Sequence, residues 1–355
     1  MPAKSERRLR VLTYRWHCPH QYELYKLDHD FALISDLGTG FTDQWDYAQR
    51  PLRPNARVVA LDQVDLRDFD FALLHFDENV LATHNTNGVI GQDWSASFKW
   101  AMQNLDMPKV AICHGTPQFY GQYDANYAWG DLGVVIEEER RRLVDYLDDV
   151  PVVCNSHQAA REWGFRNSRV IWQGFDPVEF QLSSYNRGAL ALGRAMSERP
   201  HYRGDFLFQE VARLLGDDYP IERLQVREPD LLVGSGDNIF AAARFRSYVD
   251  AIRNYSVYVN TTLRSPMPRS RGEAMLCGLA TVTARNHDVE MFITNGYDGF
   301  YAEQADELAE YVRYLIDNPE QARKIGMRGR LLSADLFNHD RCLGEWHRLI
   351  NSLVG

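Results

Sequence analysis

Short apolar runs that alternate with helical patterns constrain the fold of this chain more than any other feature. The apolar runs are rich in β-branched and aromatic residues and lie at residues 8–14, 70–76, 109–115, 151–156, 169–174, 188–194, 230–236, 256–262, 279–285 and 299–302. Segments with helical periodicity separate them, at residues 95–105, 135–149, 157–165, 246–254, 271–278 and 307–319. This alternation is typical of βαβ units, so the sequence predicts an α/β protein with doubly wound parallel sheets.

The chain is too long for a single compact core, because it has 355 residues and domains hold roughly 100–200. Both halves carry the same alternation, and residues 174–188 between them contain the glycine, proline and paired serines of a linker. We therefore expect a first domain at residues 1–178 and a second at residues 179–335. The amphipathic pattern of residues 336–355 predicts a final helix.

The charge balance excludes one broad class of function. The chain has 39 Lys and Arg against 49 Asp and Glu, a formal net charge of −10, with 45% hydrophobic residues. That hydrophobic content is typical of a globular protein. An acidic surface argues against general nucleic-acid binding, which needs basic residues to neutralise phosphates. Local basic pockets remain compatible with this balance.

The lack of a recognisable targeting signal and the cysteine usage together predict a cytoplasmic protein. No apolar run approaches the roughly 18–20 residues of a membrane span, and the first ten residues lack the apolar stretch of a signal peptide. The basic segment Lys4–Arg10 is either a peripheral contact with the inner face of the membrane or a solvated tail. The five cysteines are dispersed without CxxC spacing, which favours buried thiols over disulfides or a structural zinc site.

Histidines follow two strands of the first half, where ligands of doubly wound sheets bind. His114 comes directly after the run at residues 109–113, and a neutral imidazole there could hydrogen-bond a substrate hydroxyl or accept a proton. The alternative is a histidine that only satisfies loop carbonyls. His75 ends another apolar run and is a weaker second candidate.

The loop after the first strand carries Arg15, His17 and His20, which could contact a polar acceptor. A metal site at His17, Cys18 and His20 is the alternative, but no further ligands lie nearby to complete it. The DxD sequence at residues 68–70 precedes a strand, away from the expected cleft, and is interpreted as a charged turn.

Two arginines of the second half form a candidate diphosphate site. Arg194 ends a strand and Arg203 precedes an amphipathic helix, where guanidinium groups and a helix N-terminus together favour phosphate oxygens. The alternative is a pair of surface arginines. Glu273 lies in the first turn of another helix, as a favourable charge for the helix dipole or as an acceptor for a ribose diol.

These segments together resemble bacterial glycosyltransferases of family 4, which have the two-domain GT-B fold. The resemblance rests on the order of the following stretches: CNSHQAAREWG, VIWQGFDPVEF, GRAMSERPHYRG, VGSGDN, YVNTT, RGEAMLCGLATVT, and NGYDGFYA before DELAEYVRYLIDNPEQARKIG. It extends from about Val152 to Phe337 and is much weaker before that. It implies two Rossmann-like domains facing a central cleft, an acceptor side in the first, a nucleotide-sugar site in the second, and a final helix that crosses back.

The resemblance also implies roles for individual residues. Arg194 and Arg203 match the pair of cations on the donor diphosphate, although lysine is usual at the second position. Glu273 matches the second glutamate of an E-x7-E motif, which contacts the ribose, whereas Ser265 stands where the first glutamate would contact the donor sugar. We expect the following further residues around the donor: Arg269, Arg271, Gly272 and Gly236.

An unusual basic density marks the loop before Glu273. Arg264, Arg269 and Arg271 lie within eight residues of an otherwise acidic chain. One or more of them is expected to bind an anionic group of donor or acceptor, with helix-surface solvation as the alternative.

The resemblance implies transfer of a hexosyl or related group from a nucleotide sugar, such as a UDP- or GDP-sugar, to an acceptor hydroxyl. Transfer is expected with retention of configuration and without an obligatory metal, onto a glycan, lipid-linked or other acceptor in polysaccharide, glycolipid or glycoconjugate synthesis. The alternatives are a GT-B nucleotide-sugar epimerase, a phosphorylase, or a non-catalytic nucleotide- or sugar-binding protein. A dehydrogenase is disfavoured because no GxGxxG follows an early strand.

Overall fold

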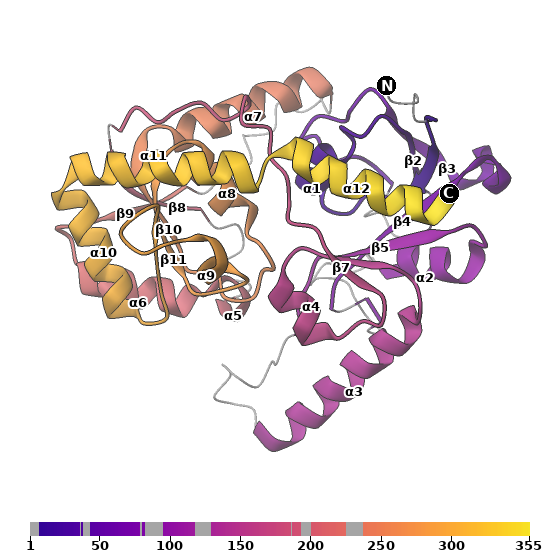
Figure 1. Cartoon of the computed structure of the whole chain (residues 1–355), viewed down its shortest axis with the longest axis horizontal. Helices are drawn as coiled ribbons and strands as arrows, with labels where there is room; N and C mark the ends of the chain where they lie inside the picture. Colours follow the sequence, from indigo (N-terminus) through magenta and orange to yellow (C-terminus); the bar gives the residue numbers. More distant parts are fainter. Residues whose placement is uncertain are drawn as a thin grey trace.

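Two parallel sheets lie side by side in the computed structural model, one in each half of the chain (Figure 1). The structure describes residues 7–35, 37, 43–78, 80–81, 95–117, 129–185, 187–192, 200–224 and 237–355, without the side chains of residues 129–136, 187, 200 and 201. The expected run at residues 230–236 lies outside these residues. Both sheets are covered by helices, so the prediction of a doubly wound α/β protein is confirmed.

The first sheet has seven parallel strands in the order β3-β2-β1-β4-β5-β6-β7. Its strands are β1 (Arg10–Thr13), β2 (Asp30–Ser35), β3 (Ala56–Ala60), β4 (Phe71–Phe76), β5 (Lys109–Cys113), β6 (Val152–Cys154) and β7 (Ser168–Val170). Its helices are α1 (Cys18–Leu24), α2 (Ser95–Asn104), α3 (Trp129–Leu147) and α4 (His157–Trp163), with short 3₁₀ turns η1 (Leu61–Gln63) and η2 (Leu66–Asp68). The strand order reverses direction between β1 and β4, and that point is where such sheets bind ligands.

The second sheet has five parallel strands in the order β12-β11-β10-β8-β9. Its strands are β8 (Arg187–Leu192), β9 (Ile221–Leu224), β10 (Tyr255–Asn260), β11 (Ala280–Ala284) and β12 (Phe300–Ala302). The helices of this part of the chain are α5 (Pro200–Arg203), α6 (Asp205–Leu215), α7 (Asn238–Ile252), α8 (Arg269–Leu276), α9 (Val289–Phe292), α10 (Ala305–Asp317), α11 (Pro319–Leu336) and α12 (His339–Val354). Here the order reverses between β8 and β10.

Each sheet is buried on both faces because successive strand residues point to opposite sides. In β1, Val11 belongs to the apolar cluster on one face and Leu12 to the cluster on the other. In β10, Val257 and Tyr258 are divided in the same way. The near-continuous apolar runs of the sequence follow from this two-sided burial.

The chain crosses between the halves twice, and the two crossings run alongside each other. The Phe175 N–H donates to the Phe337 carbonyl at 2.8 Å, and the His339 N–H donates to the Phe175 carbonyl at 3.1 Å. Helix α12 then returns to the first half, where Trp346 and Ile350 pack into one face of its sheet (Figure 1). None of the described helices is long and apolar enough to cross a membrane.

Gly326 sits where α11 passes against the backbone of the second half. A Cβ at this position would lie 2.0 Å from the Gly278 carbonyl oxygen and 3.0 Å from the Ala280 nitrogen. We expect Gly326→Ala to lower the free energy of unfolding by about 1–3 kcal/mol, because backbone atoms cannot rotate away from the added methyl group.

Gly344→Ala in α12 is the matched control. Only the flexible Arg348 side chain, at 3.8 Å, would meet the new Cβ there, so the higher helix propensity of alanine should stabilise the protein by up to about 1 kcal/mol. Urea unfolding of the two variants measures the difference. Equal stabilities would contradict the close approach at Gly326.

Candidate functional site

The loop between β1 and α1 presents imidazole groups at the carboxyl end of the first sheet. His17 has an extended backbone and caps α1, and its Nδ1 accepts a hydrogen bond from the His20 N–H at 3.3 Å. Pro19 in the first turn favours the start of the helix, because its fixed φ suits that position and its missing N–H is not needed there. The cap therefore fixes His17, and the helix places His20 one turn further on.

His114, at the end of β5, is the centre of a cluster of histidines. Its ring centroid lies 5.2 Å from that of His20, 5.8 Å from that of His17 and 5.3 Å from that of His75. The Trp16 indole stacks on the same ring at 6.3 Å. The structure thus brings together His17, His20 and His114 with His75, the weaker candidate from the sequence.

Burial keeps these imidazole groups neutral. It lowers the pKa of His114 to about 3 and places the pKa of His17, His20 and His75 well below the usual value. The charged form of each ring would lose solvation, and mutual repulsion between the histidines adds to that cost. Near neutral pH the cluster offers neutral donors and acceptors of hydrogen bonds.

Arginines of the second half face this cluster. The positive charges of Arg269 and Arg203, together with that of Arg50 from the first half, further lower the pKa of His17, after burial and the effect of His114. Arg203 ends α5, is partly buried, and lies over the Tyr202 ring with 5.2 Å between guanidinium carbon and ring centroid. Residues from both halves therefore meet at the carboxyl ends of the two sheets.

Arg269 bridges the two halves rather than covering a helix surface. Its guanidinium lies 3.4 Å from a Glu23 carboxylate oxygen on α1, 3.3 Å from Gln173 Oε1 and 3.6 Å from a Glu273 oxygen. It also stacks on the Phe175 ring at 4.4 Å. Glu23 in turn pairs with Lys26 at 2.8 Å, so the buried charges at this junction are compensated.

Glu273 is held by partners that the sequence did not reveal. The Arg50 guanidinium donates to one carboxylate oxygen at 2.9 Å and the Tyr248 hydroxyl donates to the other at 2.7 Å. Glu273 is 3% exposed, and Arg50 stacks on the Phe245 ring at 3.9 Å. Arg50 comes from the first half, from a loop without a recognisable motif, and only the three-dimensional structure brings it to α8.

Arg271 is 1% exposed and lacks a carboxylate partner within 4 Å among the described residues. Its guanidinium donates to Asn286 Oδ1 at 2.8 Å and lies 3.4 Å from the Met267 sulfur. Burial lowers the pKa of Arg271 to about 10, which leaves the group charged near neutral pH. Arg264, by contrast, lies 3.5 Å from Glu162 of the first half.

The other site residues proposed from the sequence take different places. Gly272 packs against the Phe175 ring, which would lie 2.6 Å from an added Cβ. Ser265 is partly buried in the loop after β10, and Arg15 pairs with Asp46 at 3.4 Å. The two remaining predicted residues, Arg194 and Gly236, lie outside the described residues.

The acidic turn before β4 is structural. Asp68 pairs with Arg10 at 3.2 Å, and Asp70 pairs with Arg7 at 2.6 Å and accepts the Arg10 N–H at 2.8 Å. In the part of the chain that the structure describes, no three His, Cys, Asp or Glu side chains form a group that could hold a metal ion.

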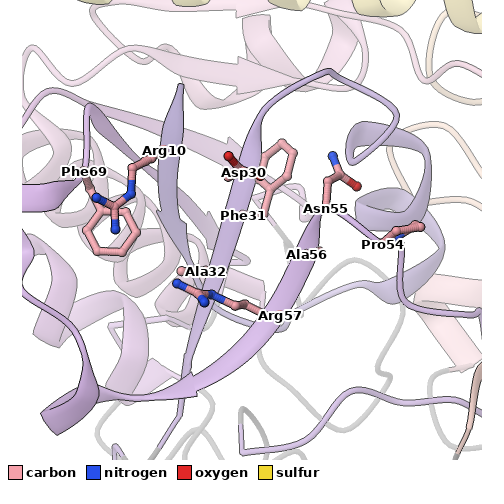
Figure 2. A pocket seen from close by; sticks show the side chains of 9 residues that line it. All are labelled: Arg10, Asp30, Phe31, Ala32, Pro54, Asn55, Ala56, Arg57 and Phe69. Carbon is pink, nitrogen blue, oxygen red and sulfur yellow. The ribbon is translucent and has the colours of Figure 1, made fainter. Parts of the chain in front are cut away.

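A surface pocket of about 310 Å³ lies at the opposite end of the first sheet (Figure 2). It is lined by the first residues of three strands, with Arg10 from β1, Asp30 from β2 and Arg57 from β3, and by Phe69. These are the amino ends of the parallel strands. The pocket is therefore separate from the histidine cluster, which follows the carboxyl ends.

Comparison with known proteins places this geometry in a known architecture. Residues 206–347 match a family model described as "Glycosyl transferase-like". No curated protein matches the chain.

Among solved structures, sucrose-phosphate synthase from Thermosynechococcus elongatus is similar with a TM-score of 0.66 and 13% identity, covering 98% of this chain and 99% of that one. HepE from Anabaena, in complex with UDP-glucose, has a TM-score of 0.62 and 13% identity, covering 97% and 100%. A glycosyltransferase from Rickettsia africae has a TM-score of 0.62 and 11% identity, covering 98% and 99%. At these identities the likeness shows the fold, and the GT-B fold expected from the sequence is confirmed.

Proposed function

We propose that this protein is a glycosyltransferase that moves a sugar from a nucleotide-sugar donor to an acceptor hydroxyl with retention of configuration. The observation that carries the proposal is the junction of neutral histidines from the first half with arginines from the second, at the ligand-binding ends of both sheets. The glycosyl transferase-like match over residues 206–347 and the UDP-glucose complex of HepE support the donor class. We place the enzyme in family 4, as a hexosyl-transferring enzyme of the cytoplasm.

The chemistry assigns roles to the two sides of the junction. As the donor bond breaks, negative charge develops on the leaving diphosphate, and Arg194 and Arg203 are the cations proposed to stabilise it. His114 is proposed to hydrogen-bond the sugar, while Arg15, His17 and His20 lie on the acceptor side. Residues 1–178 then form the acceptor domain and residues 179–335 the donor domain.

Glu273 is proposed to bind the ribose diol. In this structure the carboxylate is paired with Arg50 and Tyr248, so nucleotide binding requires the Arg50 contact to open. Opening the junction would carry Arg50 away from Glu273, because the Arg50 carbonyl accepts from the Trp45 indole N–H at 2.7 Å and so stays with the first half. Domain motion and donor binding are therefore coupled in this proposal.

Of the three arginines that precede Glu273, Arg271 is the one we propose to bind an anionic group, because its described partners are neutral. We expect Arg271→Met to keep or raise the melting temperature, since an apolar chain of similar length removes a desolvated charge. Donor affinity, measured by calorimetry, should fall about tenfold or more, as expected for loss of a charged hydrogen bond. Unchanged affinity would assign Arg271 a packing role alone.

A non-catalytic nucleotide- or sugar-binding protein is the second candidate. It is favoured by Ser265 in place of a glutamate and by the occupied carboxylate of Glu273. Both candidates predict nucleotide binding, whereas only an enzyme turns the donor over.

A thermal-shift screen against nucleoside diphosphates and their sugars tests the proposal, because a ligand at 100 times its Kd stabilises the folded state by about 2.7 kcal/mol. Ligands that raise the melting temperature are then followed for slow donor hydrolysis and for transfer to sugar acceptors. Binding without hydrolysis or transfer across the panel would favour the second candidate. No binding at all would reject both.

A further inference from the structure

His75 is a buried histidine beneath the proposed sugar-contacting residue, and no role follows for it from the reaction described above. It is 0% exposed, at the end of β4, and its Nδ1 lies 3.0 Å from His114 Nε2. The Tyr14 hydroxyl donates to the His75 carbonyl at 2.5 Å and accepts from the His75 N–H at 2.8 Å, which fixes the backbone at this residue.

The position of protons in this cluster follows from Gln21, whose amide orientation is set by two backbone groups. The Trp16 N–H can only donate, so the Gln21 amide atom that lies 2.8 Å from it is the oxygen, Oε1. The Tyr14 carbonyl can only accept, so the Gln21 amide atom that lies 2.8 Å from it is the nitrogen, Nε2. A flipped amide would place its NH₂ group against the Trp16 N–H and its oxygen against the Tyr14 carbonyl, so that donor would face donor and acceptor would face acceptor.

Gln21 Nε2 also lies 3.2 Å from His75 Nε2. The two N–H groups of this amide also have the Tyr14 carbonyl and the Tyr25 hydroxyl, the latter at 2.7 Å, as acceptors. The amide nitrogen cannot itself accept a hydrogen bond, so a proton on His75 Nε2 would face a group without a lone pair, and an unprotonated Nε2 avoids this clash. Because burial places the pKa of His75 well below its usual value, the ring is neutral and its one proton is on Nδ1.

The same reasoning extends to His114. The proton on His75 Nδ1 points at His114 Nε2, which must therefore accept. A neutral His114 then carries its own proton on Nδ1, whereas its hydrogen bond to another described side chain is made through Nε2. This is the less common tautomer of a free neutral histidine, and it leaves an N–H donor for a molecule at the junction.

We propose that His75 is a positioning residue that fixes the tautomer of His114, so that His114 meets a ligand oxygen as a hydrogen-bond donor and does not act as a base. The group it recognises is an oxygen with a free lone pair, such as a sugar hydroxyl or a phosphoryl oxygen. The catalytic consequence rests on the proposed function, whereas the tautomer itself does not.

Long-range ¹H–¹⁵N NMR of the full chain labelled with [¹⁵N]histidine reads the tautomer directly, without any ligand. His114→Gln assigns the His114 signals by their loss. We expect wild-type His114 to show a protonated Nδ1 and a bare Nε2. A protonated Nε2 on His114 would overturn the proposal, and this result needs no His75 variant to fold.

Two substitutions of similar size then separate positioning from packing. His75→Leu removes the donor and should return His114 to a mixture with Nε2 protonated, while His75→Asn can place an amide N–H near the original Nδ1 and should retain the wild-type tautomer. His29→Leu, which removes another buried histidine at the amino end of β2, should leave the His114 signals unchanged. An unchanged tautomer in His75→Leu would contradict the proposal.

Turnover gives an independent readout. With a donor identified by the thermal-shift screen, His75→Leu should lower kcat/KM about tenfold, the value of one hydrogen bond, and His75→Asn should recover most of it. Equal kcat/KM in His75→Leu and wild type would reject the catalytic consequence. If wild type shows the expected tautomer but no transfer, the proposed function fails and the assignment of His75 stands.

Discussion

Lowering the pH from 6.5 to 5.5 is expected to reduce the free energy of unfolding by about 3 kcal/mol through three buried histidines, at roughly 1 kcal/mol each. His20, His75 and His287 are at most 4% exposed, and burial lowers the pKa of each ring, in His287 to about 3. In the unfolded chain they titrate near pH 6.5. Stability is therefore complete above that pH and is lost as the pH falls, because only the unfolded state takes up protons.

Glu23 opposes part of this loss. Burial raises the pKa of its carboxyl group, so the folded state takes up a proton there more readily than the unfolded state as the pH falls. The net slope nevertheless follows the histidines, since three groups act against one.

Guanidinium unfolding at pH 7.0, 6.5, 6.0 and 5.5 measures the slope. His287→Gln should reduce the loss between pH 6.5 and 5.5 by about 1 kcal/mol, because this group no longer takes up a proton on unfolding. His157→Gln at an exposed position should leave the slope as in wild type. A flat free energy between pH 6.5 and 5.5 would show that the imidazole groups are solvated.

Arg203→Ala is expected to lower turnover about 10²–10³-fold, the typical effect of removing one preorganised donor from a developing negative charge. The residue ends α5 beside Tyr202, and its charge reaches both His17 and Tyr258. In its proposed role, a cation at this position would stabilise the leaving diphosphate more than the bound donor. The loss should therefore appear mainly in kcat.

Arg203→Lys and Arg213→Ala are the controls. The lysine keeps the charge and should restore most of the turnover, although it loses the forked geometry of the guanidinium. Arg213 on α6 is 67% exposed and pairs with Glu210 within one turn of helix, so its removal should change turnover little. Donor hydrolysis and transfer rates measure all three variants, and wild-type turnover in Arg203→Ala would refute the assignment.

The fold was largely readable from the sequence because its signal is local. Two-sided burial gives a central strand a continuous apolar run, and the predicted runs include β1, β4, β5, β6, β8, β10 and β11, as well as β7 and β12 at the sheet edges. The strands β2, β3 and β9 were not predicted. In β3 and β9 most residues are partly or fully exposed, which is typical of strands at the edge of a sheet.

The site was predicted less completely because its partners are distant in sequence. His17, His20 and His114 were found from their places after strands, and the structure brings them within contact of one another. Arg50 is 223 residues from Glu273, and Glu23 is 246 residues from Arg269. Neither Arg50 nor Glu23 belongs to a motif, so periodicity and spacing carried no signal for these pairs.

The parallel crossings of the chain restrict how the halves can move relative to each other. Two independent tethers would permit twisting, sliding and bending. Here the N–H and the carbonyl of Phe175 in the first crossing are both hydrogen-bonded to the second crossing, at residues 337 and 339. Rotation of one half relative to the other about an axis through these two bonds keeps the bonds intact. Sliding of one crossing along the other breaks both bonds. We therefore expect the bonded crossings to favour a single opening angle between the halves, so that two residues in contact across the junction would separate by an amount set by their distance from that axis.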